Sequence, residues 1–357
     1  MTALPPFDLD FPRAHGDPVC TGMLRSCDAD FQVDELLGVE LKGEGEHLYL
    51  QIEKQGQNTQ WLAGQLARAA GVRPMDVGYA GLKDRHAITR QWFSLWLPGK
   101  ESPDLQGLDI SGVRVLQQSR HDRKLKRGGH LGNRFVLRLR EVAADDALEV
   151  RLRQVRDRGV PNYYGEQRFG IDGGNLPAAE QLLSGERRVK DRNRRGLLLS
   201  AARSYLFNQL VAERVRRGNW NTYLDGDRLM VAGSSNLLSL EDSRAREADV
   251  GAAGLHPTAP LWGRGRALAE GAALALETDI LAPFSRWCEG LERAGLSRER
   301  RALGLLPEAM RWHWPEPGVL EISFCLPPGT FATSVLRECC AYRVAERNND
   351  ETTAIQR

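Results

Sequence analysis

Strand patterns occupy both ends of this chain, and the residues between them are patterned as helices. Alternation with a period of two, which predicts strands buried mainly on one face, occurs in QWFSLWLPG (91–99), RFVLRLREV (134–142) and GVLEISFCLPPG (318–329). Residues from about 146 to 217 instead carry apolar side chains at helical spacing. We therefore expect a second domain inserted into a first, with the early and late strands completing one sheet.

The helical segments have recognisable ends. NTQWLAGQLARAAG (58–71) begins with Asn58 or Thr59 as N-cap and stops at a glycine, and DDALEVRLRQVRDRGVPN (145–162) stops before its glycine and proline. A longer helix is predicted over 195–218. No repeated strand–helix–strand rhythm is present, so the sheet is predicted to be antiparallel or mixed.

Length and composition place the chain among ordinary globular proteins. Its 357 residues suggest two domains, and 41% hydrophobic with 27% charged residues is a usual balance. No apolar run is long enough to span a bilayer, and MTALPPFDLDFPRAHGDP lacks the basic flank and apolar stretch of a signal peptide. We expect a cytoplasmic protein that does not associate with membranes.

Motif searches exclude several classes of chemistry. The six cysteines form no CxxC pair and the seven histidines no HxxxH or HxH pair, so we expect reduced, buried cysteines and no metal. There is no GxxxxGK[ST] loop, no GxGxxG after a strand and no GxSxG elbow. Any chemistry should rest on carboxylates, basic residues and aromatics.

The positive charge of the chain is clustered. Net charge is only +2, yet RHDRKLKRGGHLGNRF (120–135), ERRVKDRNRRG (186–196) and RAGLSRERRALG (293–304) are strongly basic. One such cluster is usually a solvated face, but three clusters, each near glycine or asparagine, favour a surface that follows phosphates.

One carboxylate stands out because of its neighbours. In GYAGLKDRHAITRQWFS (78–94), Asp84 lies between Lys83 and Arg85 in a turn that opens onto a strand. Alone, such an aspartate is usually a solvated turn residue. The adjacent cations are poor partners for it, since neighbouring side chains in extended backbone point away from one another.

Seven segments carry a resemblance to a known family. AGLKDRHAITRQW resembles the signature of the TruD family of tRNA pseudouridine synthases, in which the aspartate after the Gly-x-Lys step is catalytic. The other similar segments occur in the family's order and cover nearly the whole chain: FQVDE (31–35), GEGEHLYLQIEKQGQNT (43–59), KLKRGGHLGNRF (124–135), GVPNYYGEQRFG (159–170), DRNRRGLLLSAARSYLFNQ (191–209) and LPPGTFATSVLRE (326–338).

The resemblance implies isomerisation of a tRNA uridine to pseudouridine, typically uridine 13 in the D arm, with tRNA as partner and no cofactor. Asp84 would act on C1′ of the ribose as nucleophile, or as the base that begins elimination to a glycal, and the sequence does not separate these paths. Such a carboxylate needs a nearby cation or donors to stay ionised. Arg25 stands where the family usually has a lysine or arginine, and we expect it to contact Asp84.

The target base must leave its helix and be held by stacking and by its polar edge. By resemblance, Phe135 stacks on the base, and Asn133, Phe31 and Phe331 contact the target nucleotide. Each of the three phenylalanines also fits a plain core position. The basic run Arg187 to Arg195 would hold phosphates.

The predicted fold is α+β. We expect a pseudouridine-synthase-type catalytic domain with a mixed, largely antiparallel sheet, formed by residues 1–158 and 306–357, and an inserted, helix-rich α/β TRUD domain over 159–305. The family also suggests a monomer. Ala259, where many members have glycine, and Gly304, which breaks a basic pattern, depart from the family inside the inserted domain.

Two other functions stay open. A tRNA-binding protein without catalysis would make Asp84 expendable. A glycoside or nucleoside hydrolase would need a second acid to activate water, for which Glu35 and Glu46 are the candidates.

Overall fold

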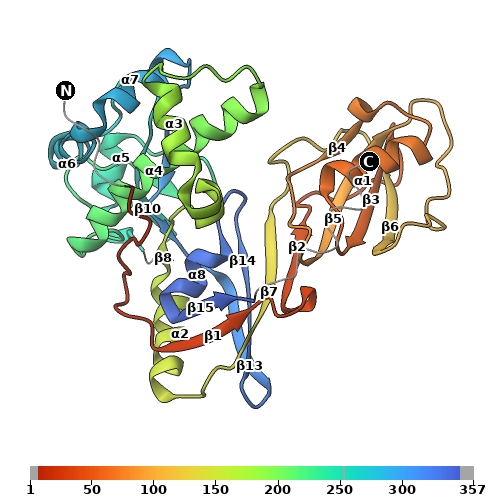
Figure 1. Ribbon diagram of the computed structural model, residues 1–357, viewed down its shortest axis with the longest axis horizontal. Coiled ribbons are helices and arrows are strands. Elements are labelled where there is room, and N and C mark those ends of the chain that lie inside the picture. The colour runs from red at the N-terminus through yellow and green to blue at the C-terminus, as the bar shows by residue number, and fades with distance from the viewer. Residues whose placement is uncertain (1–6, 252–253, 346–357) are drawn as a thin grey trace. The chain divides into compact units, whose positions relative to one another are not determined.

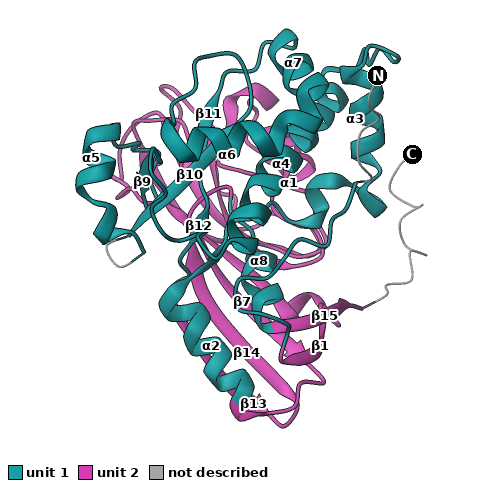
Figure 2. Cartoon of the chain, turned by 90° about the vertical axis from the view of Figure 1, so that its left-hand side faces the viewer, with its two compact units in different colours: residues 1–18, 147–307, 330–339 teal, residues 19–146, 308–329, 340–357 magenta. Residues whose placement is uncertain are grey.

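The computed structural model describes residues 7–251 and 254–345, which form two compact units. Unit 1 takes its residues from 1–18, 147–307 and 330–339, and unit 2 from 19–146, 308–329 and 340–357 (Figure 2). The range expected for the inserted domain, 159–305, lies inside unit 1. Among the described residues, that unit also takes in 7–18, 147–158, 306–307 and 330–339, which the sequence analysis had placed with the other domain.

Unit 2 is built on one sheet whose strands come from both ends of the chain. Its strands are β1 (Cys20–Leu24), β2 (Phe31–Leu36), β3 (His47–Lys54), β4 (Val77–Tyr79), β5 (Ile88–Trp96), β6 (Val113–His121), β7 (Gly132–Arg140), β13 (Glu308–Glu316), β14 (Val319–Leu326) and β15 (Cys340–Val344). The sheet runs β13-β14-β7-β2-β5-β3-β6, while β1 pairs with β7 and β15, and β4 with β5 (Figure 1). The pairings β1–β15 and β2–β5 are parallel and the others in this sheet antiparallel, which confirms the predicted mixed sheet.

The late strands complete the early sheet, as predicted. β14 pairs with β7 along eight residues, from Val319 opposite Arg140 to Leu326 opposite Asn133. Helices α2 (Asp146–Arg158) to α7 (Ser285–Arg293) lie between these two strands in the sequence. The chain therefore leaves the sheet after β7 and returns to it at β13, more than 160 residues later.

Helix α1 (Thr59–Ala69) covers one face of the sheet at β3 and β5, and the segment that contains Leu125 covers the other face there. Asn58 caps α1 by accepting hydrogen bonds from the amides of residues 60 and 61. Leu62 and Leu66 of α1 belong to a buried cluster with Leu50 and Phe93 of β3 and β5. Two short 3-10 turns belong to this unit: Asp28–Asp30 lies between β1 and β2, and Pro74–Asp76 lies between α1 and β4.

Strand β5 is buried on both faces, not mainly on one as its alternation predicted. Trp92 and Ser94, on the face opposite Phe93, are also buried. Leu125 crosses this second face, where its amide donates to the Ser94 hydroxyl at 3.0 Å and its side chain joins a cluster with Trp92 and Tyr49. The second covering comes from a segment outside the strand, so the alternation within β5 does not reveal it.

Unit 1 is mostly helical. Its further helices are α3 (Asn175–Leu183), α4 (Arg192–Arg216), α5 (Leu240–Ala245), α6 (Gly271–Leu281) and α8 (Ala332–Cys339), with 3-10 turns at Glu166–Phe169, Ile171–Gly173, Glu247–Asp249 and Ala282–Phe284. Two small sheets accompany them: β11 (Glu299–Ala302), β10 (Leu255–Leu261) and β9 (Leu229–Val231) form one, and β12 (Gly304–Leu305) with β8 (Val160–Pro161) the other.

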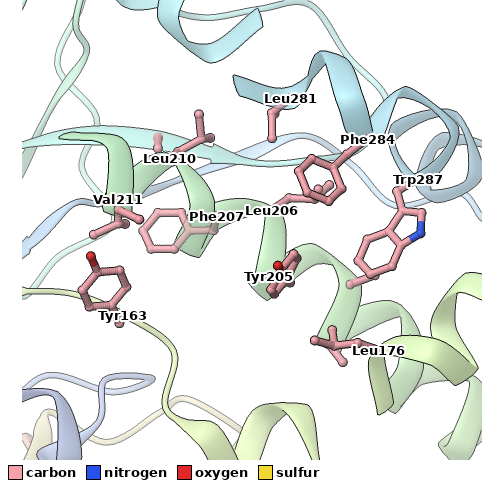
Figure 3. Close-up of a cluster of buried hydrophobic side chains, with 14 of the residues drawn as sticks. Tyr163, Leu176, Tyr205, Leu206, Phe207, Leu210, Val211, Leu281, Phe284 and Trp287 are labelled. Atoms are coloured by element: carbon pink, nitrogen blue, oxygen red, sulfur yellow. The ribbon is translucent and has the colours of Figure 1, made fainter. Parts of the chain in front are cut away.

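The core of unit 1 surrounds α4, whose apolar and aromatic side chains are buried along most of its length. Figure 3 shows Tyr205, Leu206 and Phe207 of α4 among side chains from neighbouring elements. The ring of Tyr205 lies 5.9 Å from that of Phe284 and 6.1 Å from that of Trp287. Edge-to-face contacts of this kind bury large apolar area and stabilise the unit.

Cysteine burial follows the prediction in part. Cys288, Cys339 and Cys340 are buried, whereas Cys27 is exposed because it precedes a surface 3-10 turn. Among the described helices, none combines the length and apolar character that crossing a bilayer requires.

Candidate active site

Asp84 lies in the loop of residues 80–87 between β4 and β5, which we call the Asp84 loop. Its carboxylate folds back on the loop: Oδ1 accepts a hydrogen bond from the backbone amide of His86 at 3.0 Å. This local turn is one that aspartate favours. The side chain stays 26% exposed, so a ligand can reach it.

Arg25 supplies the cation for this carboxylate, and the contact expected from the sequence is present. Its Nη1 donates to Oδ2 of Asp84 at 2.5 Å. Arg25 directly follows β1 and has φ of +63°, a left-handed conformation that costs a non-glycine residue about 1–2 kcal/mol. Its guanidinium carbon also lies 4.1 Å from the centre of the Phe31 ring. Strained backbone of this kind tends to occur where function requires a fixed geometry.

These contacts set the charge of Asp84. Burial alone would raise the pKa of its carboxyl group, but the nearby Arg25 charge and the hydrogen bonds from His86 and Arg25 outweigh burial. The pKa of Asp84 is therefore lowered below its usual value. At neutral pH the side chain is an ionised carboxylate with one oxygen bound to a guanidinium and the other to an amide.

Hydrogen bonds from buried side chains fix the backbone of the Asp84 loop. Gln91 on β5 donates to the carbonyl of Gly81 at 2.6 Å. The hydroxyl of Thr59, at the start of α1, accepts from the amide of Lys83 at 3.0 Å and donates to Gln91 Oε1 at 3.0 Å. Thr59 and Gln91 are both fully buried. These two residues connect the loop to the helix and the sheet, and the sequence analysis missed both.

Residues 54–58, which run from the end of β3 to α1 and which we call the strap, hold the loop at two further points. Lys54 donates through Nζ to the carbonyl of Asp84 at 3.0 Å. The amide of Gly56 donates to the carbonyl of Arg85 at 2.9 Å. Lys54 was also missed, although one signal was available. The inward-facing positions of β3 are Leu48, Leu50 and Ile52, and a lysine follows them at the next inward position.

Lys83 pairs with Glu35 and not with its neighbour Asp84. Its Nζ lies 2.5 Å from Oε2 of Glu35, and both side chains are buried. The other oxygen of Glu35 accepts the backbone amide of Trp92 at 3.2 Å. As anticipated from the extended backbone, adjacent residues thus serve different partners, while Arg85 is exposed.

The sheet register gathers most of the predicted nucleotide-binding residues on one face. Val33 on β2 lies opposite Phe135 on β7, and Glu35 lies opposite Asn133. Because every second residue points to the same side, Phe31, Glu35, Asn133 and Phe135 share a face. The rings of Phe31 and Phe135 meet edge to face, with centres 6.2 Å apart.

Phe135 is only 8% exposed, which also fits its alternative reading as a core residue. Its ring packs 5.8 Å from that of Phe324 on β14.

Asn133 carries an acceptor that the protein leaves unused. Its Nδ2 lies 3.3 Å from Nε2 of His130, while its buried Oδ1 has no hydrogen-bond partner. Burial lowers the pKa of His130, so this imidazole is neutral at physiological pH. A buried unpaired acceptor costs free energy and marks a position where a ligand donor would be favourable.

Comparisons with known proteins identify the family of this chain. Residues 13–186 and 187–339 match the family described as tRNA pseudouridine synthase D (TruD). The chain is 50% identical over 325 residues to the tRNA pseudouridine synthase D of Aeromonas hydrophila, covering 91% of this chain and 92% of that one. It is 50% identical over 339 residues to that of Methylococcus capsulatus, covering 94% and 95%. The chain belongs to the TruD family of tRNA pseudouridine synthases.

The fold agrees as well. A crystal structure from Methanosarcina mazei, assigned to tRNA pseudouridine synthase D, superimposes with a TM-score of 0.64 over 94% of this chain and 95% of that chain, at 20% identity. The α+β fold predicted from the sequence is therefore confirmed.

Phe331, the remaining residue that the TruD resemblance selects, belongs to unit 1. It lies just before α8, where its ring centre is 5.8 Å from that of Tyr164 and 5.9 Å from the Arg168 guanidinium carbon. Its partly buried ring thus joins an aromatic and cationic cluster within that unit.

Two arginines of the third basic cluster of this TruD member are structural and do not form an open phosphate surface. Arg300 is buried against Glu277, with Nη2 and Oε1 2.6 Å apart, and the Arg298 guanidinium lies 3.8 Å from the centre of the Trp262 ring. A Cβ at Gly304 would lie 2.8 Å from Nδ1 of His256, which explains a glycine there. By contrast, most of the run Arg187 to Arg195 is exposed.

Neither alternative acid is placed to activate water beside Asp84. Glu35 is buried and already ion-paired with Lys83. Glu46 is exposed and bonds Trp96 at the far end of β3 from Lys54, roughly 25 Å along a strand of this length. Paired glycosidase carboxylates stand at most about 9.5 Å apart. Within residues 7–251 and 254–345, no three histidine, cysteine, aspartate or glutamate side chains are grouped as metal ligands.

Proposed function

We propose that the protein isomerises a uridine of tRNA to pseudouridine, at position 13 in the D arm, with Asp84 as the catalytic carboxylate. Membership of the TruD family supports the general activity. The observation that carries the role of Asp84 is its setting: a partly exposed carboxylate held ionised by Arg25, in a loop anchored by buried side chains.

The reaction requires little beyond such a group. The uracil must leave C1′ of its ribose, rotate and rejoin through C5, with no external reagent and no cofactor. An ionised Asp84 serves either as nucleophile at C1′ or as the base for elimination to a glycal. Both oxygens of Asp84 already accept hydrogen bonds, which fixes the direction from which the sugar is approached.

The base-binding part of the proposal uses the face that Asn133 and Phe135 share. A uridine inside folded RNA must be unstacked and flipped, at a cost of a few kcal/mol. Stacking on an aromatic ring returns about 1–3 kcal/mol, and we assign it to Phe135, with Phe31 and Phe331 as further contacts. The unused Oδ1 of Asn133 suits a donor on the base edge.

Binding of the rest of the tRNA is assigned by charge. The exposed run Arg187 to Arg195 would hold phosphates, which positions RNA without reading its sequence. We assign catalysis to the sheet domain and this run to the inserted TRUD domain, in a cytoplasmic monomer.

Tritium release tests the activity and the role of Asp84 together. A tRNA transcript labelled at uridine C5 loses its label when the new C–C bond forms. The parent protein should release tritium and Asp84→Asn should not. Asp76→Asn is the matched control, because Asp76 also has a pKa lowered by an arginine, Arg73, in the same unit. If the parent and Asp84→Asn both bind tRNA but neither releases tritium, the protein would be a non-catalytic RNA binder.

Position 13 needs a separate experiment. Carbodiimide adducts of pseudouridine stop reverse transcription, so the stop should appear next to residue 13 of a treated transcript. A transcript with cytidine at that position should give neither the stop nor a loss of label. A stop at another uridine would overturn the assignment of position while leaving the activity intact.

A further inference from the structure

Lys54 is a charged residue in an apolar position. It is fully buried at the end of β3, where it continues the inward-facing series Leu48, Leu50 and Ile52. An apolar side chain there would extend the cluster under α1. Burying an ammonium group is unfavourable unless it is well paired, so a lysine at this position needs a specific reason.

Its hydrogen bonds point to that reason. Nζ of Lys54 donates to the carbonyl of Gln57 at 2.9 Å and to that of Asp84 at 3.0 Å. Both acceptors are backbone carbonyls, and neither is a carboxylate that would neutralise the charge. One bond closes the strap that leads to α1, and the other holds the residue that bears the candidate catalytic group.

We infer that Lys54 is a positioning residue for pseudouridine formation, which fixes the Asp84 loop by its ammonium group and holds positive charge behind the Asp84 carboxylate. This inference rests on the proposed function of Asp84. Arg25 binds the carboxylate oxygen, whereas Lys54 binds the backbone of the same residue. The two cations thus fix the side chain and the main chain of Asp84 separately.

The charge of Lys54 is balanced between opposing effects. Burial lowers its pKa to about 8, the charge of Asp84 opposes this, and the charge of Lys83 reinforces it. The strand neighbours that face it, Thr89 on β5 and Val113 on β6, are uncharged. The ammonium form therefore predominates at neutral pH and is lost in mildly alkaline solution.

Deprotonation of Lys54 should change activity and stability in opposite directions. A neutral amine is a weaker donor and carries no charge, so activity should fall as pH rises through about 8. Between about 8 and the ordinary lysine pKa, the unfolded chain binds a proton that the folded chain has already lost. The free energy of unfolding therefore rises with pH over that range because of this residue. A lysine that only filled space would not couple these two trends.

The test compares pH profiles of tritium release from pH 6.5 to 9.5 for the parent, Lys54→Met, Lys54→Arg and Lys42→Met. Lys42 pairs with Asp122 on the surface of the same unit and is the control. We expect Lys54→Met to lower kcat about 100-fold, as for a displaced catalytic group, with little change in KM for tRNA. The decline near pH 8 should disappear in this variant and remain in Lys42→Met. Ionisation of the RNA itself affects all four proteins equally.

Lys54→Arg guards against misfolding, since it keeps a charge throughout the pH range. If it folds, it should retain more activity than Lys54→Met and show no decline near pH 8. A parent-like rate and pH profile in folded Lys54→Met would overturn the inference, and so would a decline near pH 8 that persists in both Lys54 variants. An inactive parent would instead reject the proposed function.

Discussion

The core around α4 and the region around Asp84 are held together by different means. Around α4, Tyr205, Leu206 and Phe207 pack against apolar and aromatic side chains, and their main stabilisation, the burial of apolar surface, has no required direction. Around Asp84, Lys54, Thr59 and Gln91 are equally buried but hold the loop through hydrogen bonds of fixed direction. The first arrangement stabilises the fold of unit 1, and the second fixes the positions of the backbone atoms of the Asp84 loop.

This difference has an energetic consequence. Burying apolar surface lowers the free energy of the folded state by about 25 cal/mol per Å². A buried polar network contributes less net stability, because its groups give up hydrogen bonds to water, yet each broken link leaves an unpaired group that costs about 1–3 kcal/mol. Substitutions in the core should therefore affect folding alone, and substitutions near Asp84 should affect the reaction as well.

The largest loss of stability is expected in the core of unit 1. Leu206→Ala removes a fully buried side chain and should cost about 2–5 kcal/mol of unfolding free energy, since a cavity remains. The rate of tritium release per folded molecule should be unchanged. Denaturant unfolding and active-site titration measure the two quantities. Leu197→Ala, at an exposed position of the same helix, is the control. If the rate per folded molecule fell along with the stability, substitutions in this core would affect the reaction as well as folding, contrary to the expectation.

The sequence predicts these two regions unequally, for a physical reason. Apolar periodicity placed a helix over 58–71 and strands over 134–142 and 318–329, and α1, β7 and β14 lie there within a few residues. The hydrogen bonds of Lys54 and Thr59 to the Asp84 loop join residues 30 and 24 positions apart. No local pattern encodes such a pair, because the two partners belong to different elements and meet only in the folded chain.

The candidate site was predicted by resemblance and not by periodicity. The family pattern selected Asp84 and Arg25, and the two side chains are in contact. It did not indicate Lys54 or Gln91, because these side chains act on the backbone of the loop. A lysine in phase with apolar strand positions, as at 54, is a sequence signal that predicts a buried ammonium group.

Next in size is the effect of the cation at Asp84. Arg25→Gln should lower the tritium-release rate by about 100-fold, or about 2.7 kcal/mol of barrier. Without the guanidinium, burial raises the pKa of Asp84, so the acid limb of the pH–rate profile should move to higher pH. Arg73→Gln, which breaks a surface pair with Asp76, should leave the profile unchanged.

A glycine at position 25 sharpens this result. Since φ there is +63°, Arg25→Gly should fold more stably than Arg25→Ala by about 1 kcal/mol, although both lack the cation. Equal stability of the two would mean that the backbone relaxes and stores no strain. Faster release by Arg25→Gly than by Arg25→Ala would mean that the backbone conformation at position 25 also affects the rate, since both variants lack the guanidinium.

Smaller effects on folding stability and on the rate of tritium release are expected at Thr59. Thr59→Val keeps the shape but leaves the amide of Lys83 without its acceptor, which should cost about 1–3 kcal/mol of stability. The rate should fall several-fold because the Asp84 loop loses one anchor, and Thr59→Ser should restore it. A stability loss with an unchanged rate would assign Thr59 to folding alone, like the residues around α4.

The neighbouring residue gives the smallest effect and the closest comparison. Asn58 caps α1 through its side-chain oxygen but makes its bonds to the helix and not to the Asp84 loop. Asn58→Ala should cost about 1 kcal/mol of stability, as lost caps do, with no change in the rate of tritium release. Adjacent residues at one helix end would then separate the two kinds of stabilisation, because only Thr59 is bonded to the loop. If Asn58→Ala also slows the reaction, the start of α1 and the Asp84 loop are coupled. Residues that affect the reaction would then include some that make no hydrogen bond to the Asp84 loop.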